Sequence, residues 1–176
     1  MADFYKFAAT LLKHEGGFVD DPDDLGGATN KGVTLRTFQG VAKPILGVEP
    51  TLENLKALTD EQALKIYKAR YWDKIRGDEF ELQELADIVF DFYVNAGANA
   101  SKLLQATLND MGAEIGVDGG IGPATMAALK MRDQIEVYRL YKEGRANYYH
   151  RLVRRIPSQK KFLKGWLNRV NSFPDL

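Results

Sequence analysis

Two acidic side chains near the N-terminus are the first candidates for chemistry in this sequence. Glu15 stands immediately before a Gly-Gly pair, and Asp24 follows in a segment rich in Asp, Gly and Pro. A carboxylic acid that protonates a leaving oxygen near neutral pH needs a raised pKa, whereas its partner carboxylate must stay ionised. The pair therefore suits acid-catalysed cleavage of a glycosidic bond, a reaction that uses two carboxyl groups in these two states.

The expected surroundings of each carboxyl group fit these different roles. Glu15 falls at the predicted carboxyl end of a helix, where the helix dipole presents partial negative charge and favours the protonated acid. Asp24 falls in a turn-rich loop, where solvent would keep it ionised. The two glycines after Glu15 carry no side chains and leave room for a bulky substrate. Thr29 and Asn30, later in the same segment, are candidates to hold a water or a sugar hydroxyl.

These features also have purely structural explanations, and other motifs do not fit. A Glu before Gly-Gly is commonly only a helix end, and an Asp-Pro-Asp-Asp cluster is commonly a solvated turn. A calcium loop starting at Asp21 would place Leu25 and Gly32 at its fifth and twelfth positions, where oxygen ligands are needed. A zinc protease motif would need histidine where Phe18 stands, and a phosphate loop would need Lys-Ser or Lys-Thr after Gly32.

The composition of the 176-residue chain excludes several further classes of site. It has no cysteine, which excludes disulfides, a thiol nucleophile and cysteine-ligated metal centres. His14 and His150 are the only histidines, too few for a multi-histidine metal centre, so we expect neither a metal nor a cofactor. No apolar run approaches the roughly 20 residues that a membrane span needs. The first residues lack the features of a signal peptide, so we expect synthesis in the cytoplasm.

Hydrophobic periodicity predicts a mainly α protein that positions these residues. A helix over residues 4–15, capped by Asp3, would end at the Gly-Gly pair. The turn-forming segment 18–34 predicts a small β-hairpin or loop. Further helices are expected after residue 34 (ending before Pro44), from a capping box at 59–62, and over 82–94, 100–111, 125–131, 133–155 and 158–172. The glycine-rich segment 112–123 predicts a loop.

The charges are unevenly distributed although the net charge is zero. Residues 1–100 carry 11 Lys and Arg against 17 Asp and Glu, whereas residues 101–176 carry 13 against 7. Solvated helix faces explain this asymmetry as well as different partners do. We predict two lobes packed together, residues 1–98 and 99–176. A nucleic-acid binder is one alternative for the basic half, with affinity that falls steeply with salt. It leaves the Glu-Gly-Gly segment unexplained, so we expect no nucleic-acid partner.

Aromatic and polar residues elsewhere are candidates for binding a sugar. Phe18, Tyr71 and Trp72 offer faces on which the flat C–H side of a sugar ring would pack, and core packing is the alternative for each. Asp91 and Asn95 lie one helical turn apart and share a face. They would bind acetamido groups of a substrate or brace the loop after the first helix. We favour bracing, because polar groups on an apolar helix usually find internal partners.

A family resemblance covers nearly the whole chain. Residues 15–34 read Glu-Gly-Gly-Phe-Val-Asp-Asp-Pro-Asp-Asp-Leu-Gly-Gly-Ala-Thr-Asn-Lys-Gly-Val-Thr and resemble the signature of glycoside hydrolase family 108. This family comprises lysozyme-like N-acetylmuramidases of phage endolysins and secreted bacterial enzymes. The resemblance continues through 69–72 and 86–97, and residues 116–125 are similar to the predicted peptidoglycan-binding region of the family. Phe18 departs from the pattern, because tyrosine is common there.

The resemblance implies a lysozyme-like fold and hydrolysis of the bond between N-acetylmuramic acid and N-acetylglucosamine. Glu15 matches the family's catalytic glutamate and would be the general acid. The spacing of Glu15, Asp24 and Thr29 is similar to the Glu, Asp, Thr arrangement of phage-type lysozymes, with one residue fewer before the Thr. Either Thr29 or Asn30 would then position the attacking water. Retention or inversion depends on the separation of the two carboxyl groups.

The expected partner is the glycan strand of peptidoglycan. The enzyme would reach the wall through holin-type release or a dedicated export route, and the basic residues of segment 151–164 could attract the anionic wall. The alternative is a catalytically inactive wall-binding protein of the same fold, against which the intact Glu15 argues. The sequence implies no particular oligomeric state.

Overall fold

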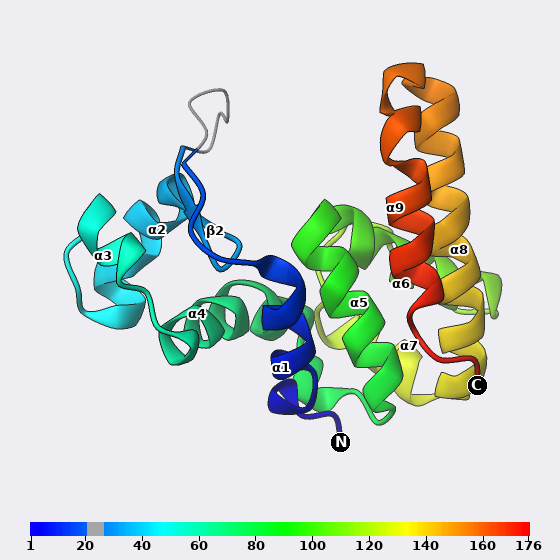
Figure 1. Ribbon diagram of the computed structural model, residues 1–176. Helices are drawn as coiled ribbons and strands as arrows, with labels where there is room; N and C mark the ends of the chain where they lie inside the picture. The colour runs from blue at the N-terminus through cyan, green and yellow to red at the C-terminus, as the bar shows by residue number, and fades with distance from the viewer. Residues whose placement is uncertain (21–26) are drawn as a thin grey trace. The chain divides into compact units, whose positions relative to one another are not determined.

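The protein is mainly helical in the computed structural model, which describes residues 1–20 and 27–176 apart from the side chains of residues 14 and 15. In those ranges the only strands are β1 (Thr29–Asn30) and β2 (Val33–Thr34), which pair antiparallel (Figure 1). This confirms the predicted mainly α fold with a small hairpin within residues 18–34. Among the helices that the structure describes, none is long and apolar enough to cross a membrane.

Contacts between residues divide the chain into two compact units. One unit is Asp3–Lys74, and the other is Ile75–Leu176 together with Met1–Ala2. The predicted lobes, residues 1–98 and 99–176, divide the chain at a different place and stay a prediction.

The unit Asp3–Lys74 consists of short helices around the hairpin. Its elements are α1 (Phe4–Glu15), β1, β2, α2 (Leu35–Val41), the π-helix η1 (Ala42–Leu46), α3 (Leu52–Lys56), α4 (Asp60–Tyr67), the π-helix η2 (Lys68–Trp72) and the start of the 3₁₀ helix η3 (Asp73–Ile75). The predicted end of a helix before Pro44 holds for α2, but the chain then continues into η1. Pro44 is tolerated there because it lies in the first turn of η1, where a backbone N–H has no helical partner.

The ends of these helices follow from local capping. The Asp3 carboxylate accepts a hydrogen bond from the backbone N–H of Tyr5 at 3.0 Å and so caps α1, as predicted. Thr59 and Gln62 form the predicted capping box at the start of α4. Phe4 on the buried face of α1 meets the ring of Trp72 edge to face, with centroids 5.6 Å apart. Aromatic packing thus joins the two ends of this unit's sequence.

The unit Ile75–Leu176 contains the longer helices. These are α5 (Gln83–Ala96), α6 (Ala98–Asp110), α7 (Pro123–Lys130), α8 (Gln134–Arg155) and α9 (Lys160–Asn171), with short 3₁₀ turns η4 (Gly77–Glu79) and η5 (Pro157–Gln159). Helix α5 is the apolar centre, and it packs on α6 and α8. Helices α8 and α9 lie side by side as a long hairpin (Figure 1).

A buried ion cluster connects three of these helices. The Asp91 carboxylate on α5 accepts a hydrogen bond from Arg145 on α8 at 2.8 Å and another from Arg169 on α9. Arg145 is fully enclosed and also stacks over the ring of Phe92 at 4.9 Å. Burial is the largest single influence and lowers the pKa of Arg145, but the charges of Asp91 and Tyr149 and the hydrogen bonds to both together raise that pKa above its ordinary value. Arg145 therefore stays charged inside the protein.

The loop before α7 is held by the side chain of Gln105. Its amide nitrogen donates to the Asp118 carboxylate at 3.0 Å and to the carbonyl of Gly120 at 3.0 Å, and its oxygen accepts from the N–H of Gly119 at 2.9 Å. Gly119 has φ +82°, and a Cβ there would lie 3.2 Å from the Cβ of Ala98. These contacts explain the glycine at position 119 without a ligand.

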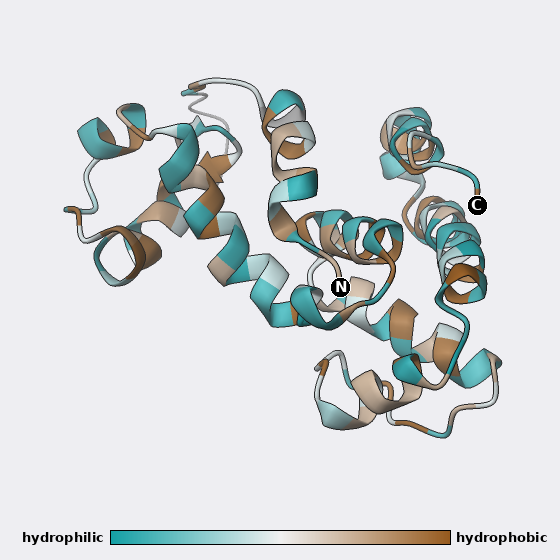
Figure 2. Cartoon of the chain, turned by 90° about the horizontal axis from the view of Figure 1, so that it is seen from below, coloured by the Kyte–Doolittle hydropathy of each residue, from teal (hydrophilic) through white to brown (hydrophobic). Residues whose placement is uncertain are grey.

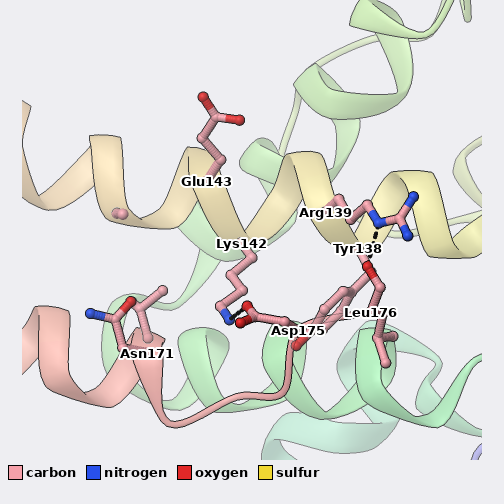
Figure 3. A pocket seen from close by; sticks show the side chains of 9 residues that line it. Tyr138, Arg139, Lys142, Glu143, Asn171, Asp175 and Leu176 are labelled. Atoms are coloured by element: carbon pink, nitrogen blue, oxygen red, sulfur yellow. Dashed lines mark hydrogen bonds and ion pairs between the residues drawn. The ribbon is translucent and has the colours of Figure 1, made fainter.

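The last residues of the chain return along α8 and are anchored there (Figure 3). The Lys142 ammonium donates to the carbonyl of Phe173 at 2.8 Å and to the Asp175 carboxylate at 2.9 Å. The Tyr138 hydroxyl donates to the carbonyl of Pro174, and burial raises the pKa of Tyr138 to about 12. A pocket of about 350 Å³ remains beside these contacts. They fix the end of α9 against α8.

We predict that Asp91→Ala destabilises the protein by about 3–5 kcal/mol, because it leaves the enclosed guanidinium of Arg145 without its counter-charge. Denaturant unfolding followed by circular dichroism measures this change in the free energy of unfolding. Glu136→Ala is the matched control, since it removes an exposed ion pair with Arg139 and should cost less than about 1 kcal/mol. Equal losses for the two variants would contradict the assigned role of the buried cluster.

Candidate active site

Glu15 is the last residue of α1, and the next residue determines how the chain leaves the helix. Gly16 has φ 68° and ψ −164°, a backbone conformation that is open essentially to glycine alone. The helix end at Glu15 is therefore encoded by Gly16. The unpaired carbonyls of the last turn give this end partial negative charge, which favours a protonated carboxyl group nearby. Asp24, the second predicted carboxyl group, lies outside the described residues.

The two glycines after Glu15 border open space. A Cβ built on Gly16 or Gly17 would have no heavy atom of the described residues within 4 Å, setting aside adjacent residues. Gly16 is needed for its positive φ, but Gly17 is under no such backbone constraint. The missing side chain at Gly17 therefore leaves free surface beside the backbone of Glu15.

The hairpin is built by a tight turn and a bridge back to the segment after α1. Val19 and Thr29 exchange two backbone hydrogen bonds of 2.7 Å. Lys31 and Gly32 both have positive φ, 51° and 77°, as the two central residues of a type I′ hairpin turn require. This turn sets the register in which Thr29 pairs with Thr34.

Helix α4 holds the hairpin turn in place. The hydroxyl of Tyr67 donates to the carbonyl of Lys31 at 3.0 Å, and the Lys31 ammonium pairs with the Asp60 carboxylate at 2.8 Å. Sequence reasoning assigned no such role to these residues. A contact between residues 36 positions apart leaves no local signal in the sequence.

Asn30 is a structural brace, which corrects its predicted role in holding a water or a sugar hydroxyl. Its side chain is 5% exposed, and its amide donates to the carbonyls of Leu55 at 2.8 Å and Lys56 at 3.2 Å. These carbonyls end α3, where the last turn lacks helical donors: Leu55 accepts a backbone bond from the N–H of Leu58 at 3.2 Å, and Lys56 accepts none from the backbone of a described residue. Asn30 thus caps α3 and ties β1 to it.

Thr29 lies on the opposite face of the same strand, because side chains alternate along β1. It is partly exposed, and its hydroxyl makes no hydrogen bond to a described residue. Its cross-strand neighbour Thr34 is engaged, since its hydroxyl accepts from the N–H of Thr37 and caps α2. Of the two candidates for positioning a water, the arrangement leaves Thr29.

The predicted aromatic residues divide between surface and core. Phe18 is exposed, and the Lys56 ammonium lies 5.3 Å from its ring centroid. Tyr71 is half-buried against Tyr67. Trp72 is 0% exposed, so its prediction as a sugar-binding residue is wrong. Trp72 ends the π-helix η2 and packs on Phe4, a contact between residues 68 positions apart that the local sequence pattern does not reveal.

The polar pair on α5 also separates. Asp91 is buried in the cluster with Arg145 and Arg169, so its predicted contact with acetamido groups is wrong. The favoured alternative was a brace for the loop after α1, but the partners of Asp91 are these two arginines. Asn95 is exposed and stays a prediction. Among the described residues, no group of three or more His, Asp or Glu side chains is placed to hold a metal ion.

Comparison with known proteins identifies the family. The sequence model described as Glycosyl hydrolase 108 matches residues 8–97. The chain belongs to this glycosyl hydrolase 108 family. The match includes Glu15 and the hairpin, so the candidate active site lies in the hydrolase part. A second model, described as Predicted Peptidoglycan domain, matches residues 99–171 of this glycosyl hydrolase 108 protein.

A solved structure agrees with the family assignment. The chain is similar to the structure of Brucella abortus SagA, with a TM-score of 0.74 and 30% sequence identity. The alignment covers 97% of this chain and 90% of SagA. No match was found among curated proteins. The resemblance seen in the sequence is thus confirmed, as is the mainly α lysozyme-like fold.

We predict that Asn30→Ala destabilises the protein by about 1–3 kcal/mol, because it leaves the carbonyl of Lys56 without a donor among the described residues and the carbonyl of Leu55 with backbone donors alone. Thr29→Val is the matched control on the neighbouring position, and it should change the free energy of unfolding by less than about 0.5 kcal/mol. Thermal and urea unfolding measure both. A neutral Asn30→Ala would mean that Asn30 is not the brace of the hairpin.

Proposed function

We propose that the protein is an N-acetylmuramidase that hydrolyses the β-1,4 bond between N-acetylmuramic acid and N-acetylglucosamine, with Glu15 as its general acid. The observation that carries the proposal is the family match over residues 8–97, in which Glu15 ends α1 beside open space at Gly17. The match over residues 99–171 supports peptidoglycan as the substrate.

The chemistry requires one proton donor and one ionised group. The Glu15 carboxyl group gives its proton to the glycosidic oxygen as the bond to the anomeric carbon breaks. A water then adds to that carbon as hydroxide. The proton that this water loses passes to a carboxylate, so that the Glu15 acid is regenerated for the next cycle. The partial negative charge at the end of a helix favours the protonated form of a carboxyl group there, which supports the donor role proposed for Glu15. Asp24 is proposed as the ionised carboxylate.

The hairpin supplies the positioning groups in this proposal. Thr29 presents its hydroxyl on the face that is not used for bracing, where it would orient the water or a sugar hydroxyl. Asn30 and Tyr67 keep that strand in one place through their bonds to α3 and the turn. Phe18 is the exposed ring available for packing against the C–H face of a sugar. Tyr71 and Asn95 complete the proposed substrate-binding residues.

We predict that Glu15→Gln lowers the rate of peptidoglycan hydrolysis by at least about 100-fold, because the amide cannot donate the proton. Turbidity clearing of purified peptidoglycan measures the rate, and mass spectrometry of the released fragments identifies the reducing sugar. Glu61→Gln, an exposed glutamate on α4, is the matched control and should keep the wild-type rate.

The fragments decide between the alternatives. Reducing muramic acid ends from the wild type alone would support a muramidase that uses Glu15. Reducing glucosamine ends would support a glycoside hydrolase that cleaves the other bond of the glycan strand, between N-acetylglucosamine and N-acetylmuramic acid. A folded wild type that clears nothing would favour the inactive wall-binding protein.

The two glycines after Glu15 allow a separate test. Gly17→Ala should leave stability within about 0.5 kcal/mol of wild type and lower activity, because a methyl group would occupy the space proposed for substrate. Gly16→Ala should cost about 1–3 kcal/mol of stability, because alanine disfavours φ 68°. Unfolding curves and clearing rates separate the effects. Full activity of Gly17→Ala would show that substrate does not approach there.

A further inference from the structure

The end of the α8–α9 hairpin carries an unusual concentration of positive charge. Between Glu143 and Asp175 the sequence has eight Lys and Arg residues and no Asp or Glu. Arg145 and Arg169 are used by Asp91. The others form, with the residues between them, a surface that we call the basic tip: Arg151, Arg154, Arg155, Lys160, Lys161 and Lys164. All six are exposed, and none forms an ion pair with a described residue.

The basic tip also exposes apolar side chains. Ile156, which follows the last residue of α8, is 41% exposed, and Phe162 on α9 is 45% exposed. Of residues 150–165, all within the described part of the chain, none is buried. The ring of Phe162 contacts the ring of Trp166, and Trp166 stacks on Tyr149 with ring centroids 5.0 Å apart. A row of three aromatic rings thus extends from the tip along the hairpin.

The tip is presented away from the core of its own unit. Figure 1 shows the joined ends of α8 and α9 extending beyond α5, α6 and α7. Hydrophilic residues predominate along both helices, with isolated hydrophobic ones among them (Figure 2). The buried cluster around Asp91 fixes both helices at the base of the hairpin. The hairpin is therefore held at its base, and its far end carries exposed apolar groups and cations that form no ion pair with a described residue.

We propose that the basic tip docks on the surface of a membrane that contains anionic phospholipids. Lipid phosphates would meet the six cations, and Ile156 and Phe162 would enter the boundary between headgroups and acyl chains. Long Lys and Arg side chains suit this arrangement, because their apolar stems can lie in the boundary while their charges stay in water. Basic residues beside exposed aliphatic and aromatic ones are the composition typical of interfacial binding.

The apolar residues distinguish a membrane from other anionic partners. A nucleic acid would be attracted by the same cations, but Ile156 offers it neither a stacking face nor a hydrogen bond. Peptidoglycan is the other rival, since the predicted peptidoglycan domain reaches residue 171 and so contains the tip. Its carboxylates would also be attracted, but an exposed isoleucine gains little from them. The proposal does not depend on the bond that the hydrolase cleaves.

The test is co-sedimentation of the full-length protein with vesicles. We expect binding to vesicles of phosphatidylglycerol mixed with phosphatidylcholine, weakening as salt is added, and little binding to phosphatidylcholine alone. Lys160→Gln with Lys161→Gln should weaken binding to the anionic vesicles roughly 30-fold. Lys102→Gln with Lys130→Gln is the matched control, because it removes two exposed cations outside the tip, and it should bind like wild type.

A pair of isoleucines tests insertion. Ile156 and Ile135 are each 41% exposed and lie at opposite ends of α8, Ile156 directly after its last residue. Ile156→Ser should weaken binding to the anionic vesicles about fivefold, whereas Ile135→Ser should leave it unchanged. Both positions are on the surface, so circular dichroism should show wild-type folding for each variant.

Three results would overturn the proposal. One is equal binding to neutral and anionic vesicles, and another is a tip variant that binds vesicles like wild type. The third is a tip variant that keeps vesicle binding but loses binding to insoluble peptidoglycan or to duplex DNA, which would assign the tip to that polymer. Clearing of purified peptidoglycan is measured in parallel, and tip variants should retain it. Lost vesicle binding is thereby separated from lost hydrolysis.

Discussion

The carboxylate of Asp91 is the point on which the C-terminal unit depends. It lies on the apolar central helix α5 and binds two guanidinium groups, from α8 and α9. A buried charge is costly unless its partner is equally well placed, so the three helices are held in one arrangement. The hairpin α8–α9 can extend beyond the core because its base is fixed in this way. Compared with apolar residues of the same size, the buried ion cluster fixes the relative positions of α5, α8 and α9 more than it adds to the free energy of unfolding.

The N-terminal unit uses a neutral side chain for the same purpose. Asn30 donates two hydrogen bonds to the end of α3, and Tyr67 donates one to the hairpin turn. A two-stranded hairpin of this size is marginal by itself, so these bonds from neighbouring helices keep it in place. One face of β1 then supports the hairpin through Asn30, and the other is partly exposed at Thr29. Thr29 belongs to the second face because strand geometry alternates side chains.

The parts of the fold that local chemistry determines could be predicted from the sequence. The Asp3 cap and the capping box at Thr59 depend on residues within one turn of each other. The burial of Trp72 and the use of Asn30 and Asp91 could not be predicted. Each depends on partners 25 or more positions away, and the same residue types are equally common at binding sites. A polar side chain in an otherwise apolar segment indicates that it has a hydrogen-bonding partner, but the sequence does not show whether that partner is another residue of the protein or a ligand.

Because the net charge is zero, the uneven distribution of Lys, Arg, Asp and Glu along the chain affects how the protein is oriented rather than how strongly it is attracted from a distance. A neutral protein has no long-range attraction to an anionic surface beyond about one Debye length, roughly 10 Å at moderate salt. Closer to the surface, the attraction depends on which part of the chain faces it. Six cations at one hairpin end, with no acidic residue among them, favour a single orientation in which that end leads. The acidic residues of the first half disfavour the others. The distribution of charge therefore orients the protein at an anionic surface, while the net charge of zero limits its non-specific binding to other anionic surfaces.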